Sequence, residues 1–372
     1  MQIHLRAYIN GNLGDDLFIR IITNRYPSHF FTIVGPKRYK DSFEDIKNLK
    51  WISSDKLAYK FITKGINFVG KIFSVSKLCY FNFNSFLNNK LSKLSELNVL
   101  ISGSYFIEWN NDKQYLDYYY KNEIVYYKTR PYVIGINFGP YKTDTYKNIH
   151  NQLFEYASFL SVRDTKTYKM FEDLNPIYAP DIVFLYDGLN PSYHEEYFLT
   201  ISVINYAKAM EGDYIDKMAE IIDSVVLKGL KVCLLSFCDA EGDSSTINQI
   251  IKKMKADTSD VKIIKYNEVG VSTIISIMKS SKYVIAGRYH SMILSWLLGL
   301  CTIPVCYSPK MENVILDIFP QSVYFNLDNI SDLNFEDVIE NITPTKLDSS
   351  IILQAEKHFE MLDERLKGKI NE

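Results

Sequence analysis

The sequence predicts an α/β protein of two domains, each a parallel β-sheet with helices on both faces. Three observations predict it. The chain has 372 residues, which is long for one hydrophobic core. Short apolar or β-branched runs alternate with longer helical segments, a pattern typical of parallel sheets. A polar stretch with Gly and Pro at 186–196 interrupts this alternation, which then restarts.

Six strands are expected before the interruption, at 3–8, 30–34, 98–102, 132–137, 158–162 and 181–185, and five after it, at 199–204, 231–236, 261–265, 282–286 and 302–306. The expected helices are 14–26, 144–156, 211–228, 244–256, 271–279, 290–299, 335–341 and 348–368. We therefore expect domains at 1–188 and 189–345, with the C-terminal helix at 346–372 packing back on the first. A ligand would lie between the domains, at the C-terminal ends of the strands.

The composition excludes several classes of protein. Hydrophobic residues are 47%, charged residues 23% and the net charge is −2, so overall charge gives no support to a nucleic-acid partner. No stretch is long and apolar enough to cross a bilayer, and the N-terminus lacks the pattern of a secretion signal. The five cysteines form no CxxC pair and the six histidines are scattered, so we expect reduced thiols, no metal site and a cytoplasmic location.

One segment, 56–95, departs from the α/β pattern. It contains seven lysines and no acidic residue, with Phe, Tyr, Ile and Leu interleaved. Such a segment suits a helix lying on an anionic membrane, so we expect peripheral contact with the inner face of the cytoplasmic membrane. The alternative is an inserted helical hairpin whose lysines are simply solvated.

The most informative stretch is 283–319, where a strand ends at Gly287 and a buried helix begins near His290. Arg288 and His290 stand two residues apart at this helix N-terminus, with Ser291 in the first turn. Backbone N–H groups and the helix dipole favour an anion there, and an arginine adds a forked positive charge. The alternative is structural: Arg288 pairs with a carboxylate and His290 caps the helix.

Two further groups of residues follow predicted strands. Tyr307 and Lys310 follow the strand at 302–306 and are expected near the rim of the same site, although Lys310 also fits a solvated surface position. In the first domain, Arg163 ends the strand at 158–162 and is expected to face the ligand. The alternative for Arg163 is an ion pair with its neighbour Asp164.

A glycine-rich turn, "NGNLGDD", separates the first strand from the first helix. Such turns usually bind phosphate, but here two carboxylates in the first helical turn would repel an anion. We therefore expect the turn to bind an uncharged sugar: glycines allow close approach of the backbone, and the polar side chains offer hydrogen bonds. The residues concerned are Asn10, Gly11, Asn12, Gly14, Asp15 and Asp16. The alternative is helix capping by Asn12, with both acids favouring the dipole.

The blocks "GNLGDDLF", "SVRD", "APDIVF", "ISV" and "GRYHSMILSWLLGLCTIPVCYSPK" together resemble the polysaccharide pyruvyl transferase family, from about residue 7 to 317. The resemblance implies two Rossmann-like domains facing across a cleft, as in glycosyltransferases of the B type (GT-B). It implies transfer of pyruvate from phosphoenolpyruvate, without a cofactor, to two hydroxyls of a sugar in a bacterial surface polysaccharide (capsule or exopolysaccharide) or its lipid-linked precursor. The acceptor would then be a sugar, expected to be linked to polyprenyl diphosphate.

The resemblance also suggests residue roles. Arg288 and Arg163 would bind the two anionic ends of phosphoenolpyruvate, with Ser291, Tyr307 and Lys310 assisting. His290 would bind the phosphate or act as general acid. Asp15 would take the proton of the attacking hydroxyl. The alternatives are a GT-B glycosyltransferase that uses a nucleotide sugar, and a non-catalytic sugar-binding subunit of capsule assembly.

Overall fold

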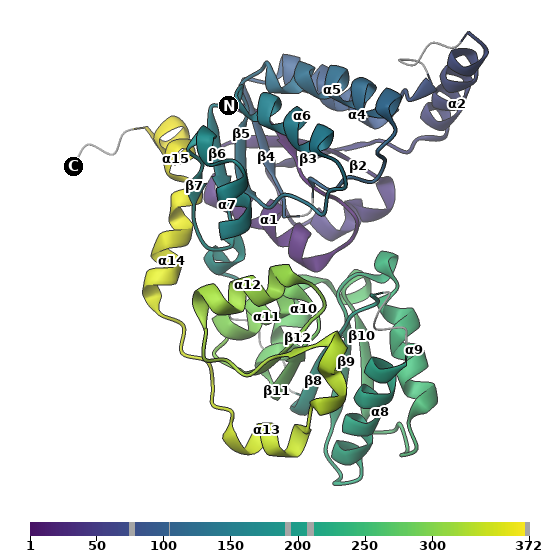
Figure 1. The fold of residues 1–372 in the computed structure, drawn as a ribbon, viewed down its shortest axis with the longest axis vertical. Helices are drawn as coiled ribbons and strands as arrows, with labels where there is room; N and C mark the ends of the chain where they lie inside the picture. The colour runs from purple at the N-terminus through teal and green to yellow at the C-terminus, as the bar shows by residue number, and fades with distance from the viewer. Residues whose placement is uncertain (74–78, 104, 190–194, 207–211, 369–372) are drawn as a thin grey trace. The chain divides into compact units, whose positions relative to one another are not determined.

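The computed structural model describes residues 1–73, 79–103, 105–189, 195–206 and 212–368 and divides them into two compact units. Unit 1 consists of Met1–Ile9, Phe18–Ile182 and Gln354–Glu372, and unit 2 of Asn10–Leu17 and Val183–Leu353. Each unit is a parallel sheet with helices around it (Figure 1). The start of the first helix and the turn before it thus belong to unit 2, and the end of the chain belongs to unit 1.

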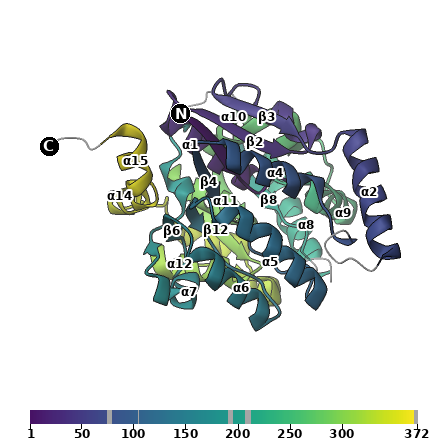
Figure 2. The ribbon, with the colours of Figure 1, turned by 90° about the horizontal axis from the view of Figure 1, so that it is seen from above.

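Unit 1 contains a seven-stranded sheet in the order β3-β2-β1-β4-β5-β6-β7. Its strands are β1 (Gln2–Arg6), β2 (Phe30–Gly35), β3 (Leu49–Ser53), β4 (Leu97–Ile101), β5 (Tyr132–Ile136), β6 (Phe159–Val162) and β7 (Ile177–Tyr178). Its helices are α1 (Leu13–Arg25, whose first five residues belong to unit 2), α2 (Leu57–Ile72), α4 (Phe83–Leu94), α5 (Lys113–Tyr127), α6 (Asp144–Phe154) and α7 (Thr165–Met170). Figure 2 shows α4, α5 and α6 side by side, with α2 beyond them at the periphery.

Unit 2 contains a six-stranded parallel sheet in the order β10-β9-β8-β11-β12-β13. Its strands are β8 (Tyr197–Val203), β9 (Val232–Ser236), β10 (Val261–Lys265), β11 (Ser281–Ala286), β12 (Cys301–Cys306) and β13 (Phe325–Asn326). The helices that follow are α8 (Asp213–Val226), α9 (Asp243–Lys253), α10 (Tyr266–Lys279), α11 (Tyr289–Leu297), α12 (Pro309–Ile318), α13 (Phe335–Asn341), α14 (Ser349–Ala355) and α15 (Glu360–Lys367). The last of these, α15, belongs to unit 1.

Both sheets have the strand order of the Rossmann fold. In each, the chain builds outward in one direction and then crosses back, so β1 and β4, and likewise β8 and β11, are neighbours at the point where the order reverses. Ligands of open α/β sheets bind outside the carboxyl ends of the strands at this switch point. At the switch point of unit 2, β11 ends at Ala286, and Arg288 and His290 follow at the start of α11.

The C-terminal segment is bound to unit 1 by polar and ionic contacts. The Arg25 guanidinium pairs with Glu356 and Asp363, and Tyr26 donates a hydrogen bond to Asp363. The buried His358 ring bonds the Ser161 hydroxyl and the Pro180 carbonyl. Figure 1 shows α15 at the edge of unit 1, near β6 and β7.

Most expected strands are present, but the one predicted at 181–185 is wrong. Residues Ile182–Leu185 form a 3₁₀ turn after Pro180. A short apolar run gives no periodicity that separates a strand from a buried turn. The sequence also gave no prediction for β3, β7 and β13. The interrupting stretch at 186–196 includes 190–194, and the basic segment includes 74–78, which lie outside the described residues.

Candidate functional site

The loop after β11 is the centre of the candidate site in unit 2. The Ser202 hydroxyl, at the end of the neighbouring strand β8, accepts hydrogen bonds from the backbone N–H groups of Gly287 at 3.1 Å and Arg288 at 3.3 Å. A Cβ on Gly287 would lie 2.5 Å from the Ser202 carbonyl oxygen, so only glycine fits this turn. These contacts fix the position at which α11 begins.

Arg288 is buried and held by two carboxylates. Its Nε donates to Asp243 Oδ2 at 3.2 Å, its Nη2 pairs with the other oxygen of Asp243, and its Nη1 pairs with Glu241. The side chain of Asp243 is fully buried, whereas that of Glu241 is 34% exposed. Burial opposes the charge of Arg288, but Asp243 and Glu241 outweigh it, so the pKa of the guanidinium is raised. The alternative expected from the sequence, in which Arg288 pairs with a carboxylate, is therefore what the structure shows.

His290 and Ser291 form the first turn of α11, which contains no acidic residue. Both are buried, and the Ser291 hydroxyl donates to the Arg288 carbonyl oxygen at 2.8 Å. The His290 ring lies against the backbone of Gly14, where a Cβ would stand only 1.7 Å from Nδ1. The absence of a side chain at Gly14 is thus what makes room for the imidazole, within unit 2.

Tyr307 and Lys310 follow β12, the strand hydrogen-bonded to β11. The Lys310 ammonium lies 4.6 Å from the centre of the Tyr289 ring, a cation–π contact, and the Tyr307 ring packs against Tyr206. Tyr307 also lies close enough to Arg288 to raise the pKa of its guanidinium, after the larger effects of Asp243 and Glu241. The structure therefore gathers all the unit 2 candidates at one edge of the sheet.

The glycine-rich turn makes its contacts within unit 2. The Leu13 N–H donates to the Phe237 carbonyl at 3.1 Å, and the Tyr266 hydroxyl donates to the Asp16 carboxylate at 2.7 Å. Asn12 accepts a hydrogen bond from the Gly14 N–H, as a capping residue does. Asp15 and Asp16 are both buried. The remaining turn residues are Asn10, whose carbonyl accepts from the Cys238 thiol, and Gly11, whose φ of 64° suits glycine.

Arg163 follows β6 and belongs to unit 1, whereas the other candidate residues belong to unit 2. Its guanidinium pairs with Asp181 and donates to Asn137 at 2.7 Å, with no side-chain exposure. A Cβ on Gly103, after β4, would lie 2.1 Å from Nη2. The expected alternative, a pair with Asp164, is not what the structure shows, because Asp164 caps α7 instead.

Unit 1 contains an aromatic pocket that no motif in the sequence predicted. It has a volume of about 220 Å³ and lies beside the loop that follows β4. Its lining is rich in tyrosine and amide groups: Tyr80, Asn82, Ser85, Tyr105, Ile107, Trp109, Asn110, Tyr115, Tyr118, Tyr119, Asn122, Glu123 and Tyr146. The indole of Trp109 is 72% exposed. The signal available in the sequence was the tyrosine content, 28 of 372 residues, without any spacing that would localise it.

Within the described ranges, no group of three or more His, Cys, Asp or Glu residues is arranged to hold a metal ion. Nor do the helices that the structure describes include one long and apolar enough to span a membrane.

Two Rossmann-type parallel sheets with a polar site at the switch point of the second define an α/β protein of the GT-B type. The chain belongs to the polysaccharide pyruvyl transferase family, because the family model of that description matches residues 5–309. It is thus a member of a transferase family of polysaccharide biosynthesis.

Solved structures share this fold at low sequence identity. A putative UDP-N-acetylglucosamine 2-epimerase from Listeria monocytogenes has a TM-score of 0.58 and 8% identity, over 98% of this chain and 96% of that one. Anabaena Alr3699/HepE, in complex with UDP and glucose, has a TM-score of 0.57 and 11% identity, over 98% and 99%. At these identities the likeness concerns the fold. No curated protein matches the chain.

Proposed function

We propose that the protein transfers the pyruvyl group of phosphoenolpyruvate to two hydroxyls of one sugar, forming a cyclic ketal and releasing phosphate. The acceptor is a bacterial surface polysaccharide or its lipid-linked precursor. The observation that carries the proposal is the family match over residues 5–309. The geometry that supports it is the helix N-terminus at the switch point of unit 2, with its cluster of polar side chains.

The reaction balances without a redox partner. A proton adds to the CH₂ carbon of phosphoenolpyruvate while a sugar hydroxyl oxygen bonds to C2. The bond between C2 and the phosphate oxygen then breaks, and its electron pair leaves with phosphate. A second hydroxyl of the same sugar bonds to C2 and closes the ring. Of the two hydroxyl protons, the product methyl group accounts for one and the released phosphate for the other.

The donor site that we propose is the N-terminus of α11. Its first-turn N–H groups, that of Ser291 among them, face the phosphate, and Lys310 supplies positive charge. His290 acts as the general acid or binds the phosphate, since an imidazole suits both roles near neutral pH.

Arg288 is proposed to bind the donor through Nη1. The Asp243 fork holds the guanidinium plane, and Glu241, which is partly exposed, gives way to the anion. Because Glu241 occupies Nη1, the anion binds there only when Glu241 swings out. Arg163 belongs to unit 1, where its guanidinium is buried against Asp181 and Asn137, and its role toward the donor stays a prediction.

The acceptor side is proposed to include the glycine-rich turn of unit 2. In unit 1, the aromatic pocket is proposed to bind a sugar by itself. Asp15 accepts the proton of the attacking hydroxyl, and Asp16 and the amides of Asn10 and Asn12 hold sugar hydroxyls. Trp109 offers an exposed indole face on which a sugar ring can stack, and the pocket beside it offers amide donors and acceptors. No cofactor or metal takes part.

The test is to incubate the purified protein with a glycan acceptor and, in separate reactions, phosphoenolpyruvate or a UDP-sugar. Release of phosphate from phosphoenolpyruvate, in step with acceptor consumption, is expected. Release of UDP from the nucleotide sugar instead would identify a glycosyltransferase. Binding of sugar with neither release would indicate a non-catalytic subunit. Trp109→Ala is expected to raise the KM for the acceptor and leave that for phosphoenolpyruvate unchanged.

A further inference from the structure

Helix α2 exposes an apolar face that unit 1 leaves uncovered. Leu57, Phe61, Phe68 and Ile72 are each between 59% and 69% exposed. At 3.6 residues per turn these four positions fall within about 60° of one another around the helix. A helix of a soluble protein normally turns such a face toward the core. Figures 1 and 2 show α2 at the periphery, beyond α4.

Lysines lie along one edge of this apolar face. Lys60, Lys64 and Lys71 fall within about 40° of one another on the same helix, next to the apolar positions. All three are exposed, and no acidic residue occurs anywhere in 56–95. An apolar face flanked by positive charge is complementary to an anionic lipid surface, where apolar side chains enter the acyl region and lysines meet phosphates.

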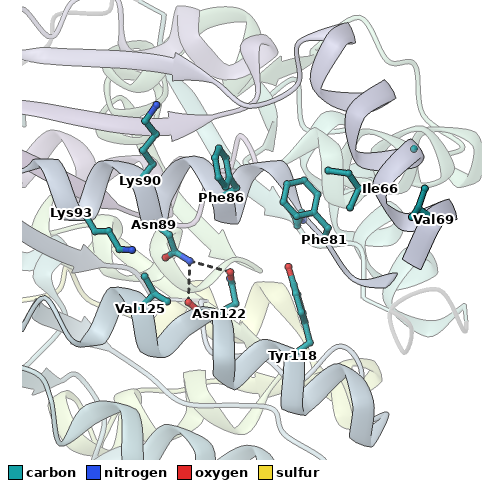
Figure 3. Close-up of a pocket in the computed structure, with 12 residues that line it drawn as sticks. Ile66, Val69, Phe81, Phe86, Asn89, Lys90, Lys93, Tyr118, Asn122 and Val125 are labelled. Atoms are coloured by element: carbon teal, nitrogen blue, oxygen red, sulfur yellow. Dashed lines mark hydrogen bonds between the residues drawn. The ribbon is translucent and has the colours of Figure 1, made fainter. Parts of the chain in front are cut away.

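A cavity of about 700 Å³ opens beside this face, between α2, α4 and α5 (Figure 3). Ile66 and Val69 of α2 line one side, and Phe81 and Phe86 lie between them and α5. Lys90 and Lys93 of α4 are also in its lining. The cavity is mostly apolar, and Val69 in its lining is itself 43% exposed.

We propose that α2 lies flat in the surface of an anionic phospholipid bilayer and that the cavity between α2, α4 and α5 receives an acyl chain from it. At 16 residues, or about 24 Å, α2 is too short to span a bilayer and carries too many lysines, but it fits the interface. Lys90 and Lys93 are placed to meet the phosphate of that lipid. The inference is independent of the reaction that the protein catalyses.

The experiment is cosedimentation of the full chain with vesicles. Vesicles of phosphatidylglycerol and phosphatidylcholine are expected to bind the protein, and pure phosphatidylcholine vesicles to bind it at least about tenfold more weakly. Binding that is equally weak to both would overturn the proposal. High salt is expected to reduce binding, since it screens the lysines.

Two pairs of variants distinguish vesicle binding through this face from nonspecific adsorption of the protein. Phe61→Glu/Phe68→Glu is expected to abolish binding, whereas Leu227→Glu/Val323→Glu, at equally exposed positions of unit 2, is expected to retain it. Lys60→Glu/Lys64→Glu is expected to lose binding to the anionic vesicles, and Lys252→Glu/Lys255→Glu to keep it. Equal losses in the controls would contradict the proposal.

The remaining occupant to exclude is a second copy of the chain. Light scattering on the wild type and on Phe61→Glu/Phe68→Glu measures the oligomeric state without lipid. A dimer that the double variant dissociates, together with no vesicle binding, would assign the face to self-association and overturn the membrane proposal. A Val69→Trp variant whose added fluorescence is quenched by brominated acyl chains would support the placement of lipid at the cavity, and its insensitivity to them would contradict it.

Discussion

The guanidinium of Arg288 is forked onto the buried carboxylate of Asp243, which comes from the start of α9, 45 residues earlier in the chain. The same carboxylate accepts hydrogen bonds from the backbone N–H groups of Phe237 at 3.0 Å and Cys238 at 2.9 Å. Asp243 thus ties the loop after β9 to the loop after β11. Its contacts fix the guanidinium plane, and Nη1 pairs with the partly exposed Glu241.

The first prediction concerns the stability of this pair. Asp243→Asn leaves a buried guanidinium without its counter-charge, so we expect the free energy of unfolding to fall by about 3 kcal/mol or more. Glu241→Gln, at a third-exposed side chain, is expected to cost less than about 1 kcal/mol. Urea unfolding of the two variants measures both. Equal losses would contradict the distinction between the two carboxylates.

Glu241→Gln and Arg288→Lys are expected to change donor binding in opposite directions. If Glu241 competes with the donor for Nη1, Glu241→Gln removes a repulsive charge and is expected to lower the KM for phosphoenolpyruvate several-fold. Arg288→Lys loses the fork and is expected to raise that KM by about tenfold. Phosphate release measures both. An unchanged KM in Arg288→Lys would remove Arg288 from the donor site.

The contact between Gly14 and His290 gives a prediction with a matched control. A Cβ at Gly14 would overlap the imidazole, so Gly14→Ala is expected to displace His290 and lower kcat by about 10²-fold, as His290→Ala does. Gly65→Ala, at a glycine with nothing within 4 Å of the added Cβ, is expected to leave kcat unchanged on a soluble acceptor. Near-normal turnover by a folded Gly14→Ala variant would contradict a catalytic role for the imidazole in this position.

Acid is expected to destabilise unit 1. Burial lowers the pKa of His4, His150 and His358 from 6.5 to about 4 each, and all three lie in unit 1. Between these values the unfolded chain binds more protons than the folded one. The contribution of the three neutral histidines to the free energy of unfolding is therefore complete above pH 6.5. It is lost as the pH falls toward 4, by up to about 4 kcal/mol per pH unit for three sites.

Urea unfolding at pH 7, 6 and 5 measures this dependence, and His358→Gln provides the comparison. The variant removes one of the three sites, so its stability is expected to depend less steeply on pH, whatever its stability at pH 7. A slope identical to that of the wild type would show that His358 is not neutral in the folded state. The imidazole donates to the Pro180 carbonyl and accepts from Ser161 only when neutral.

Removal of metal ions is expected to have no effect on turnover. The proposed donor site supplies its positive charge from Lys310, Arg288 and the α11 N-terminus. Incubation with a chelator, followed by the phosphate release assay, tests this. Loss of activity that returns on adding a divalent cation would contradict the proposed donor site.

Local patterns in the sequence predicted ten of the thirteen strands that the structure describes. They also placed the start of α11 near His290, one residue from its first residue Tyr289. They could not predict which acid holds Arg288, because Asp243 reaches it only through the order of strands β9, β8 and β11. The same holds for Arg163, whose partner Asp181 follows it by 18 residues in an irregular segment. Partners of buried charges are set by topology, which residue spacing alone does not specify.

The surroundings of the glycine-rich turn and of the aromatic pocket were the least predictable part of the structure. The buried Asp16 carboxylate accepts a hydrogen bond from Tyr266, which lies 250 residues further along the chain. The aromatic pocket gathers side chains from the loop after β4 and from helices α4, α5 and α6, none of which carries a recognisable sugar-binding motif. By contrast, the interleaved lysines and apolar residues of 56–95 were evident in the sequence. Which of these apolar residues are exposed on α2 came from the structure.

The most direct measurement of the central claim is a mass spectrum of the acceptor after incubation with phosphoenolpyruvate and the protein. The account predicts a product heavier by one pyruvic acid minus one water, with one phosphate released per product, and neither product nor phosphate with His290→Ala. An acceptor of unchanged mass beside intact phosphoenolpyruvate, or a gain of one hexose from a UDP-sugar, would contradict it.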